Sequence, residues 1–372
     1  MRIGVPKEIK DNEYRVGLTP SSVAELVDHG HAVLVEKGAG LGAGFGDAAY
    51  ESNGAALVEE PAGVFESADL IVKVKEPLAP ERRMLRRGQT IFTYLHLAPD
   101  LQLTQELLRS GANCIGYETV TSAQGGLPLL TPMSEVAGRL APQIGAHFLE
   151  KASGGRGVLL AGAPGVPAAE VAILGAGVVG SAATAIALGM GASVIVADRD
   201  PEALRRLDMR LRGSARTVFS TRTAIAEIVK RADLVIGAVL LPGARAPRLI
   251  VNEMLTTMRP GAVIVDVAID QGGCCESSRA TSHSDPTYVV DDVVHYCVPN
   301  MPGVVPRTSS FALSNATLPF VLAIADKGWR RALREDAHLR AGLQISDGRI
   351  VSEAVAQAHG LPCVSVETAL KD

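Results

Sequence analysis

Aromatic residues are scarce in this sequence, and so is any strong excess of charge. Phe, Tyr and Trp make up 4% of the 372 residues, whereas apolar residues make up 47%. The hydrophobic cores must therefore be built from Ala, Val, Leu and Ile, which suits buried parallel strands layered with helices. The formal net charge of −4 offers no basic surface to a polyanion, so we expect no nucleic-acid partner.

Cysteine is also infrequent, and the first residues contain no apolar segment. Of the five cysteines, Cys274 and Cys275 are adjacent, and none of the five has the spacing of a zinc site or a disulfide framework. We therefore expect reduced thiols and no metal. The opening residues MRIGVPKE do not have the pattern of a signal peptide. These features predict a cytoplasmic protein with no membrane association.

The most informative segment is a glycine-rich turn near the middle of the chain. An apolar run at 171–174 is followed by Gly175, Gly177 and Gly180 in the spacing G-x-G-x-x-G, and the next apolar run ends in Asp198. In a dinucleotide fingerprint the first glycine forms the tight turn and the second lets the backbone approach the pyrophosphate. The third lets the helix pack closely on the strand. The segment therefore predicts a Rossmann unit whose helix N-terminus binds phosphate.

Two other interpretations of this segment exist, a membrane span and a purely structural turn. A separate question is which dinucleotide the segment would bind. Residues 171–197 carry no charge and are long enough for a membrane span, but they contain five glycines and no anchoring aromatic residue. A purely structural glycine turn is the other alternative, against which the flanking strand and acid argue. Asp198 favours NAD because a carboxylate accepts hydrogen bonds from a free ribose 2′-hydroxyl, although Arg199 could pair with a 2′-phosphate.

Short apolar runs alternate with helical patterns in both halves of the chain. This rhythm predicts an α/β fold with two Rossmann-like, doubly wound domains that are separated by a cleft and linked by helices. The candidate strands lie at 2–5, 32–36, 70–74, 90–93 and 114–117 in the first half, and at 171–174, 193–197, 234–237 and 262–267 in the second.

Two breaks divide the chain into domains. The Thr-Pro pair at 131–132 is typical of a helix start, and the proline-rich loop at 299–306 precedes another helical pattern. We predict a substrate domain formed by residues 1–128 plus 307–372 and an NAD-binding domain formed by residues 129–306. Because the chain crosses between the domains twice, we also expect a hinge.

Polar side chains follow several of the candidate strands. Lys75 and His96 follow strands of the first domain, Asp270 and Asn300 follow extended runs of the second, and Arg15 lies in the loop after the first strand. Ligands of open α/β sheets bind beyond the carboxyl ends of the strands, so we expect these residues to face one cleft. Each has a structural alternative: a core histidine, a solvated lysine, a turn aspartate or an arginine paired with a surface carboxylate.

Seven motifs together resemble the L-alanine dehydrogenases along essentially the whole chain, and the nicotinamide-nucleotide transhydrogenases share part of the same framework. The motifs are GVPKE at 4–8, RVGLTP at 15–20, KVKEP at 73–77, YLHLA at 94–98, RADLVIG at 231–237, IDQGG at 269–273 and VPNMPG at 298–303.

The resemblance implies a role for each of the polar side chains. Arg15 and Lys75 would hold the substrate carboxylate, which suits the bidentate fork of arginine. His96 would be the acid–base group, because imidazole exchanges protons near neutral pH, and Asp270 would be the second catalytic group. Asn300 would position the substrate and the nicotinamide. The order in which His96, Lys75 and Asp270 move protons stays open.

The resemblance also implies a set of cofactor contacts for NAD. A departure from the family pattern is Ala203, where relatives commonly have a basic residue that can reach the adenosine ribose. The implied contacts are Ser134, Gly175, Gly177, Val178, Val179, Gly180, Asp198, Ser220, Val239, Leu240, Val267, Asp270, Arg279, Val298, Asn300 and Met301.

The activity that the resemblance implies is the reversible, NAD-dependent oxidative deamination of L-alanine to pyruvate and ammonia. Hydride would pass from the alanine Cα to the nicotinamide, and water would then add to the imine without a metal. The alternative is the nucleotide-binding subunit of a transhydrogenase, which requires membrane segments and a second nucleotide-binding domain that this sequence lacks. The family further implies a homohexamer.

Overall fold

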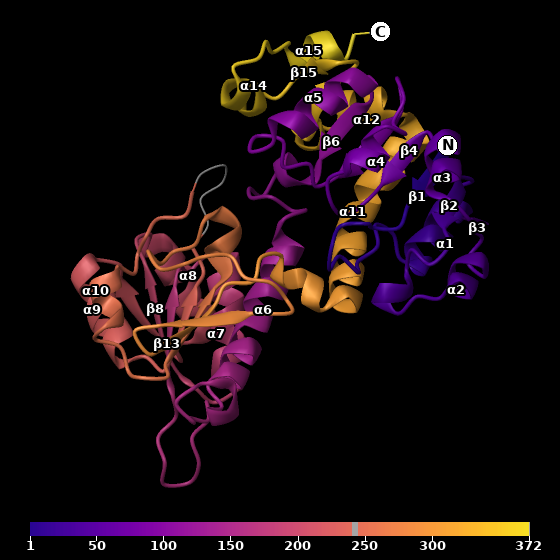
Figure 1. The fold of residues 1–372 in the computed structure, drawn as a ribbon. Helices are drawn as coiled ribbons and strands as arrows, with labels where there is room; N and C mark the ends of the chain where they lie inside the picture. Colours follow the sequence, from indigo (N-terminus) through magenta and orange to yellow (C-terminus); the bar gives the residue numbers. More distant parts are fainter. Residues whose placement is uncertain (240–244, 372) are drawn as a thin grey trace. The chain divides into compact units, whose positions relative to one another are not determined.

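The computed structural model describes residues 1–239 and 245–371 of the chain. These residues form two compact units, of which unit 1 comprises Met1–Met133 and Val305–Asp372 and unit 2 comprises Ser134–Val304 (Figure 1). The chain leaves unit 1 within helix α6 (Thr131–Phe148) and returns just ahead of helix α11 (Pro306–Lys327). The passages predicted from the sequence follow residues 128 and 306.

Unit 1 is built on an eight-stranded sheet in the order β15-β14-β6-β5-β4-β1-β2-β3. The six strands from β1 to β6 are parallel and follow the order 3-2-1-4-5-6 of a Rossmann sheet, while β14 and β15 add antiparallel pairs beyond β6. The strands are β1 (Arg2–Val5), β2 (Ala32–Glu36), β3 (Ala56–Val58), β4 (Leu70–Val72), β5 (Thr90–Thr93), β6 (Asn113–Gly116), β14 (Leu343–Ser346) and β15 (Arg349–Ile350).

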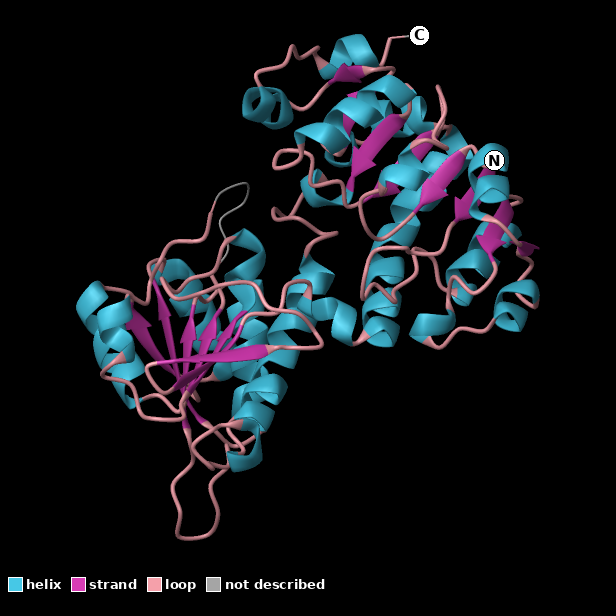
Figure 2. Cartoon of the chain, in the orientation of Figure 1, coloured by secondary structure: helices cyan, strands magenta, loops and turns pink. Residues whose placement is uncertain are grey.

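Helices surround this sheet, and their ends follow local sequence signals (Figure 2). Helix α5 begins after Asp100, whose carboxylate accepts the Leu103 N–H, and ends at Gly111 in the left-handed conformation. Its buried residues Leu103 and Leu107 pack into the core of unit 1. The helices are α1 (Pro20–Asp28), α2 (Asp47–Glu51), α3 (Pro61–Ser67), α4 (Ala79–Arg82), α5 (Leu101–Ser110), α11, α12 (Trp329–Glu335), α13 (Ala337–Arg340), α14 (Glu353–His359) and α15 (Val366–Ala369).

Unit 2 repeats the same topology. Its seven-stranded sheet has the order β12-β13-β11-β10-β7-β8-β9. The six parallel strands β7, β8, β9, β10, β11 and β13 again follow the order 3-2-1-4-5-6, and β12 is antiparallel at the edge. The strands are β7 (Glu170–Leu174), β8 (Ser193–Asp198), β9 (Arg216–Phe219), β10 (Leu234–Gly237), β11 (Val263–Asp266), β12 (Thr287–Val290) and β13 (Val293–Tyr296), and the helices after α6 are α7 (Val178–Gly189), α8 (Pro201–Leu211), α9 (Arg222–Arg231) and α10 (Asn252–Leu255).

The predicted fold class, two Rossmann-like units linked by helices, is confirmed. The nine candidate strands all exist, with ends that differ by at most two residues from those predicted. The strands β3, β9, β12, β14 and β15 were not predicted, and β13 was expected only as an extended run without bounds. They are short, and the analysis of the segment after residue 306 recognised only helices there.

Helix α11 is long and apolar enough to cross a membrane by length and composition alone. Its polar residues argue for a core helix, because Ser310 and Ser314 are fully buried. The Ser310 hydroxyl accepts the Val16 N–H at 3.1 Å, and the Ser314 hydroxyl accepts the Thr19 N–H at 3.2 Å. These hydrogen bonds therefore hold the loop before α1 against α11 within unit 1.

Candidate active site

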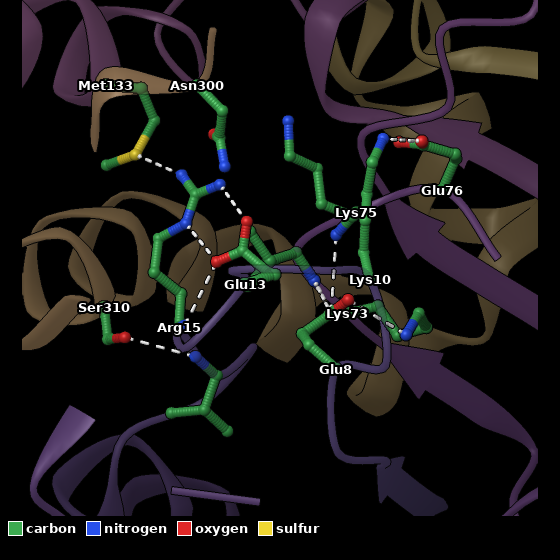
Figure 3. A network of polar contacts seen from close by, with 12 residues as sticks. Glu8, Lys10, Glu13, Arg15, Lys73, Lys75, Glu76, Met133, Asn300 and Ser310 are labelled. Carbon is green, nitrogen blue, oxygen red and sulfur yellow. Dashed lines mark hydrogen bonds and ion pairs between the residues drawn. The ribbon is translucent and has the colours of Figure 1, made fainter. Parts of the chain in front are cut away.

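Arg15 lies in the loop between β1 and α1 of unit 1, inside the protein (Figure 3). Glu13 holds its guanidinium side-on, with 2.7 Å from Nε to Oε1 and 2.5 Å from Nη2 to Oε2, and Nη1 lies 3.1 Å from the Met133 sulfur. Only 2% of the arginine side chain and none of the glutamate side chain is exposed. The alternative of a pair with a surface carboxylate is therefore wrong, because the partner is buried.

Lys75 follows β4 in the same unit and is largely withdrawn from solvent. Burial lowers the pKa of its ammonium, and the positive charge of Arg15 lowers it further. Its carbonyl oxygen accepts a hydrogen bond of 2.9 Å from the Thr93 hydroxyl at the end of β5. Two cations that repel each other in a buried setting form a site in which a bound anion would be stabilised. The alternative of a merely solvated lysine does not fit this environment.

A buried ion cluster lies next to Lys75, and the sequence analysis missed it. Lys73 contacts the carboxylates of Glu8 and Glu81 at 3.1 Å and 2.5 Å, and all three side chains are nearly inaccessible. Glu8 is 65 residues away from Lys73 in the sequence, so the contact has no local signature. The only signals were the motifs GVPKE and KVKEP, which contain Glu8 and Lys73 but not Glu81.

His96 follows β5 in an unusual backbone conformation, with φ of 49°. Its N–H donates to Glu118 Oε1 at 2.8 Å, the Leu95 N–H bonds the same carboxylate at 3.2 Å, and the Gln344 amide donates to it at 3.0 Å. The imidazole is exposed and stacks on the Tyr94 ring, with centroids 5.9 Å apart. The core-histidine alternative is therefore wrong, and the ring is accessible for proton exchange.

In unit 2 the glycine turn joins β7 to α7 as the fingerprint predicts. Gly177 is the N-cap of α7, no side chain caps the first N–H groups of that helix, and a Cβ at Gly177 would meet no atom within 4 Å. A Cβ at Gly180 would lie 1.8 Å from the Gly175 carbonyl oxygen, so this contact requires glycine. The helix N-terminus therefore offers donors to an anion.

Asp198 ends β8 and faces the same turn. One of its carboxylate oxygens accepts the Ala176 N–H at 2.5 Å, and the other accepts the Asp200 N–H at 2.8 Å. The Ser220 N–H donates to the Asp198 carbonyl at 2.9 Å, so these two implied cofactor contacts lie together. An ionised carboxylate has about four acceptor positions, which leaves capacity for ribose hydroxyls.

Asp270 and Asn300 also lie together in unit 2. The Asn300 N–H lies 3.2 Å and 3.3 Å from the two Asp270 carboxylate oxygens, and Asn300 has φ of 55°. Asp270 belongs to a 3-10 helix (Val267–Gln271) that begins after the fully buried Asp266. Asp266 accepts hydrogen bonds from the Ala268 N–H, the Cys274 N–H and the Ser278 hydroxyl, and it is a support that the sequence analysis missed.

The remaining implied cofactor residues of unit 2 vary in their surroundings. The Arg279 guanidinium lies 4.0 Å above the Tyr288 ring, and the Arg279 backbone N–H donates to the Tyr288 hydroxyl at 2.9 Å. Leu240 lies outside the described residues. Val298 and Met301 are buried, whereas Ser134, Val239 and Val267 are half-buried and Val178 is exposed.

The described residues contain one group with the composition of a metal site, although the sequence analysis expected no metal. Ligand atoms of Asp266, Cys274 and Cys275 lie within 4.8 Å of one another, and all three residues are buried. The Asp266 carboxylate already accepts three hydrogen bonds. The neighbouring Cys275 and burial raise the pKa of the Cys274 thiol, which disfavours the thiolate that a metal needs. We assign no metal to this group.

Fold and residues together define the class of the protein, a Rossmann-type oxidoreductase that binds a dinucleotide. Two family models match the chain, the alanine dehydrogenase/PNT N-terminal domain over residues 4–137 and the alanine dehydrogenase/PNT C-terminal domain over residues 141–353. The chain belongs to the alanine dehydrogenase/PNT family.

Relatives in this family match the chain over its whole length. An alanine dehydrogenase of Halomonas elongata is 59% identical over 98% of each chain, and one of Bacillus subtilis is 53% identical over 100% of this chain and 98% of its own. A solved L-alanine dehydrogenase superposes with a TM-score of 0.94 at 50% identity, covering 97% of this chain and 99% of its own. A transhydrogenase from Sinorhizobium meliloti is more distant, with a TM-score of 0.82 and 28% identity over 95% of this chain and all of its own.

Proposed function

We propose that this protein catalyses the NAD-dependent, reversible oxidative deamination of L-alanine to pyruvate and ammonia. The observation that carries the proposal is the 59% identity, over 98% of each chain, to a protein named alanine dehydrogenase. The transhydrogenase alternative is disfavoured, because that relative is only 28% identical. A nucleotide-handling subunit would also have no use for the buried cations of unit 1.

Unit 1 would bind the amino acid or the oxo acid. The substrate carboxylate needs a cationic partner, and Arg15 and Lys75 supply two such charges in a setting that water screens poorly. Glu13 occupies one edge of the guanidinium, and the Nη1 contact to the Met133 sulfur is a weak one that a carboxylate oxygen would replace at a gain.

Unit 2 would bind NAD, and its residues fit that group. The open space at Gly177, the uncapped start of α7 and the carboxylate of Asp198 match a pyrophosphate and a ribose in turn. When bound, NAD supplies the acceptor for the hydride of the alanine Cα. We also propose that the individual residues implied as cofactor contacts by the resemblance, of which Ser134 is the first and Met301 the last, bind NAD.

His96 and Asp270 would handle protons and water at the substrate carbon. The exposed imidazole can accept a proton from water that adds to the imine and can later return it to the leaving ammonia. Glu118 fixes the backbone of His96, which limits the positions of its ring. Asp270 would orient the water or amine. Asn300, whose backbone N–H donates to the Asp270 carboxylate, would position the substrate.

The finer assignments follow from the same proposal. Unit 1 corresponds to the substrate domain, which the sequence analysis defined as residues 1–128 plus 307–372, and unit 2 corresponds to the NAD-binding domain. We assign the protein to the cytoplasm, without nucleic-acid or membrane partners, and assign it a homohexameric assembly. Analytical ultracentrifugation of the purified protein tests the assembly directly.

The activity is tested by mixing the purified protein with L-alanine and NAD⁺ and following NADH absorbance. We expect NADH to form with L-alanine and to be consumed when pyruvate and ammonia are added together. Serine and 2-aminobutyrate in place of alanine would report how small the side chain must be. Transfer of hydride between two nicotinamide nucleotides, with no response to alanine, would instead support the transhydrogenase alternative.

A further inference from the structure

The loop that presents Lys75 is anchored at both ends by buried carboxylates. Where the loop leaves β4, Glu8 Oε1 accepts the Val74 backbone N–H at 2.7 Å and lies 3.4 Å from the Lys75 backbone nitrogen. Where the loop enters α4, Glu81 Oε2 accepts the Leu78 N–H at 2.7 Å. The two anchors therefore fix the backbone on either side of the residue that would bind the substrate.

A single ammonium joins the two anchors. Lys73 Nζ lies 3.1 Å from Glu8 Oε2 (Figure 3). The same nitrogen lies 2.5 Å from Glu81 Oε1. Each carboxylate thus gives one oxygen to the ammonium and turns the other to the loop backbone. Because Lys73 immediately precedes the loop in the chain, the arrangement closes a ring of contacts around it and fixes the spacing of its ends.

This cluster is costly to bury, and its charges depend on one another. The side chains of Glu8, Lys73 and Glu81 are 1%, 0% and 3% exposed. Burial acts to lower the pKa of Lys73, but Glu8 and Glu81 outweigh it and raise that pKa, so the ammonium stays charged. Apolar side chains would fill the same volume at a lower cost in desolvation, so stability alone is a poor reason to keep three buried charges.

We propose that Glu8, Lys73 and Glu81 are positioning residues, which act on the substrate through Lys75 by fixing the loop that carries it. The inference rests on the proposed function, because it takes Lys75 as the partner of the substrate carboxylate. Loosening either anchor lets the Lys75 ammonium move, and small displacements of a positioning group weaken binding strongly. The cofactor side lies on unit 2, so its affinity does not depend on this cluster.

The test measures pyruvate binding to the full-length protein saturated with NADH, by calorimetry and without ammonia, so that no turnover occurs. Glu81→Ala is expected to weaken pyruvate binding by about tenfold and to leave NADH affinity unchanged. Glu81→Gln should recover part of this loss, because its amide oxygen can still accept the Leu78 N–H, whereas its NH2 group cannot accept from the Lys73 ammonium. Glu106→Ala is the matched control, since it removes the Arg82 ion pair of the same helix without touching either anchor.

A second variant leaves every buried charge with its ionic partner, so it is less prone to misfold than Glu81→Ala. Leu78→Pro removes the anchored N–H and keeps all three ionic side chains, and the Leu78 φ of −78° suits proline. It should weaken pyruvate binding as Glu81→Ala does. If pyruvate binds both Leu78→Pro and Glu81→Ala as tightly as the parent protein, the anchors do not position Lys75 and the inference is overturned.

The decisive measurement combines these changes with Lys75→Met. If the anchors act through Lys75, adding Leu78→Pro to Lys75→Met causes no further loss of pyruvate affinity, whereas independent effects would multiply. Multiplying effects overturn the inference and leave the proposed function intact. If Lys75→Met alone leaves pyruvate affinity unchanged, the proposed role of Lys75 fails, and the inference fails with it.

Discussion

Glu13 and Arg15 form a bidentate ion pair inside unit 1, with 2.7 Å from Arg15 Nε to Glu13 Oε1 and 2.5 Å from Arg15 Nη2 to Glu13 Oε2. The Arg15 N–H also bonds Glu13 Oε1 at 3.1 Å, so backbone and side chain are bound by the same carboxylate. Arginine has many side-chain conformers, and this arrangement selects one of them. An arginine that is fixed before the substrate arrives loses less conformational entropy when it binds.

Replacing Glu13 with Ala should therefore lower both stability and substrate affinity. A buried guanidinium that loses its carboxylate costs about 3–5 kcal/mol in the free energy of unfolding. We expect a lower thermal unfolding midpoint and a raised KM for pyruvate, with the KM for NADH unchanged. Glu59→Ala is the control, because Glu59 pairs with Lys37 at the surface and should change stability by less than about 1 kcal/mol. Equal effects of the two substitutions would contradict the account.

His96→Ala should lower kcat by roughly 10²–10⁴, the usual contribution of one acid–base group. The loss should appear in turnover and not in NADH affinity, because the imidazole is exposed and belongs to unit 1. Steady-state kinetics and direct NADH titration separate the two effects. His147→Ala, an exposed histidine on α6, should behave as the parent protein does. A His96→Ala variant with parental kcat would remove His96 from the mechanism.

Much of the fold could be predicted from the sequence because its signals are local. In β7 four consecutive apolar residues are buried on both faces, and the glycines that follow have steric requirements that show in the sequence itself. Likewise, the end of each parallel strand marks where a ligand binds, which led to Lys75 and His96.

The supports of these residues could not be predicted, because their partners are distant in the chain. Glu8 meets Lys73 across 65 residues, and Glu118 meets the His96 backbone across 22. A glutamate that will be buried has the same local pattern as one that stays in solvent. The pairing of β14 with β6 likewise joins segments that are far apart in the chain, and only the folded sheet shows it.

The pH dependence of substrate binding should report on Lys75. Burial and Arg15 lower its pKa, so the ammonium loses its proton below the ordinary lysine range of about 10.4. As the pH rises through that lowered pKa, pyruvate affinity should fall. Stability changes in the opposite direction. Between the lowered pKa and a pH of about 10.4, the unfolded chain keeps the Lys75 proton that the folded protein has lost, so the contribution of Lys75 to the free energy of unfolding increases with pH. Calorimetric titration of NADH-loaded protein at a series of alkaline pH values checks the first expectation. Lys75→Met should bind weakly at every pH and show a flatter profile, and an unchanged slope in that variant would assign the titration to another group.

Substitutions at three glycines of helix α7 and its N-cap distinguish effects on folding from effects on cofactor binding. A Cβ at Gly180 would lie 1.8 Å from the Gly175 carbonyl oxygen and 3.4 Å from the Ala238 Cβ, so the turn and helix must move apart. Gly180→Ala should cost about 1–3 kcal/mol of stability and also weaken NADH binding. Gly189→Ala is the control, because its Cβ meets no atom within 4 Å, and it should stabilise the protein by about 0.4–1 kcal/mol.

Gly177→Ala is the informative change among the three. Its Cβ would also meet no protein atom within 4 Å, and the residue has φ of −71°, which alanine adopts freely. We therefore expect a thermal unfolding midpoint close to that of the parent protein. The methyl group would nevertheless stand at the start of α7, where a pyrophosphate must approach the backbone, so NADH affinity should fall by at least about tenfold. Unfolding curves with and without NADH distinguish the two effects, because a ligand stabilises only the form that binds it. Parental NADH affinity in Gly177→Ala would mean that the dinucleotide does not lie on this turn.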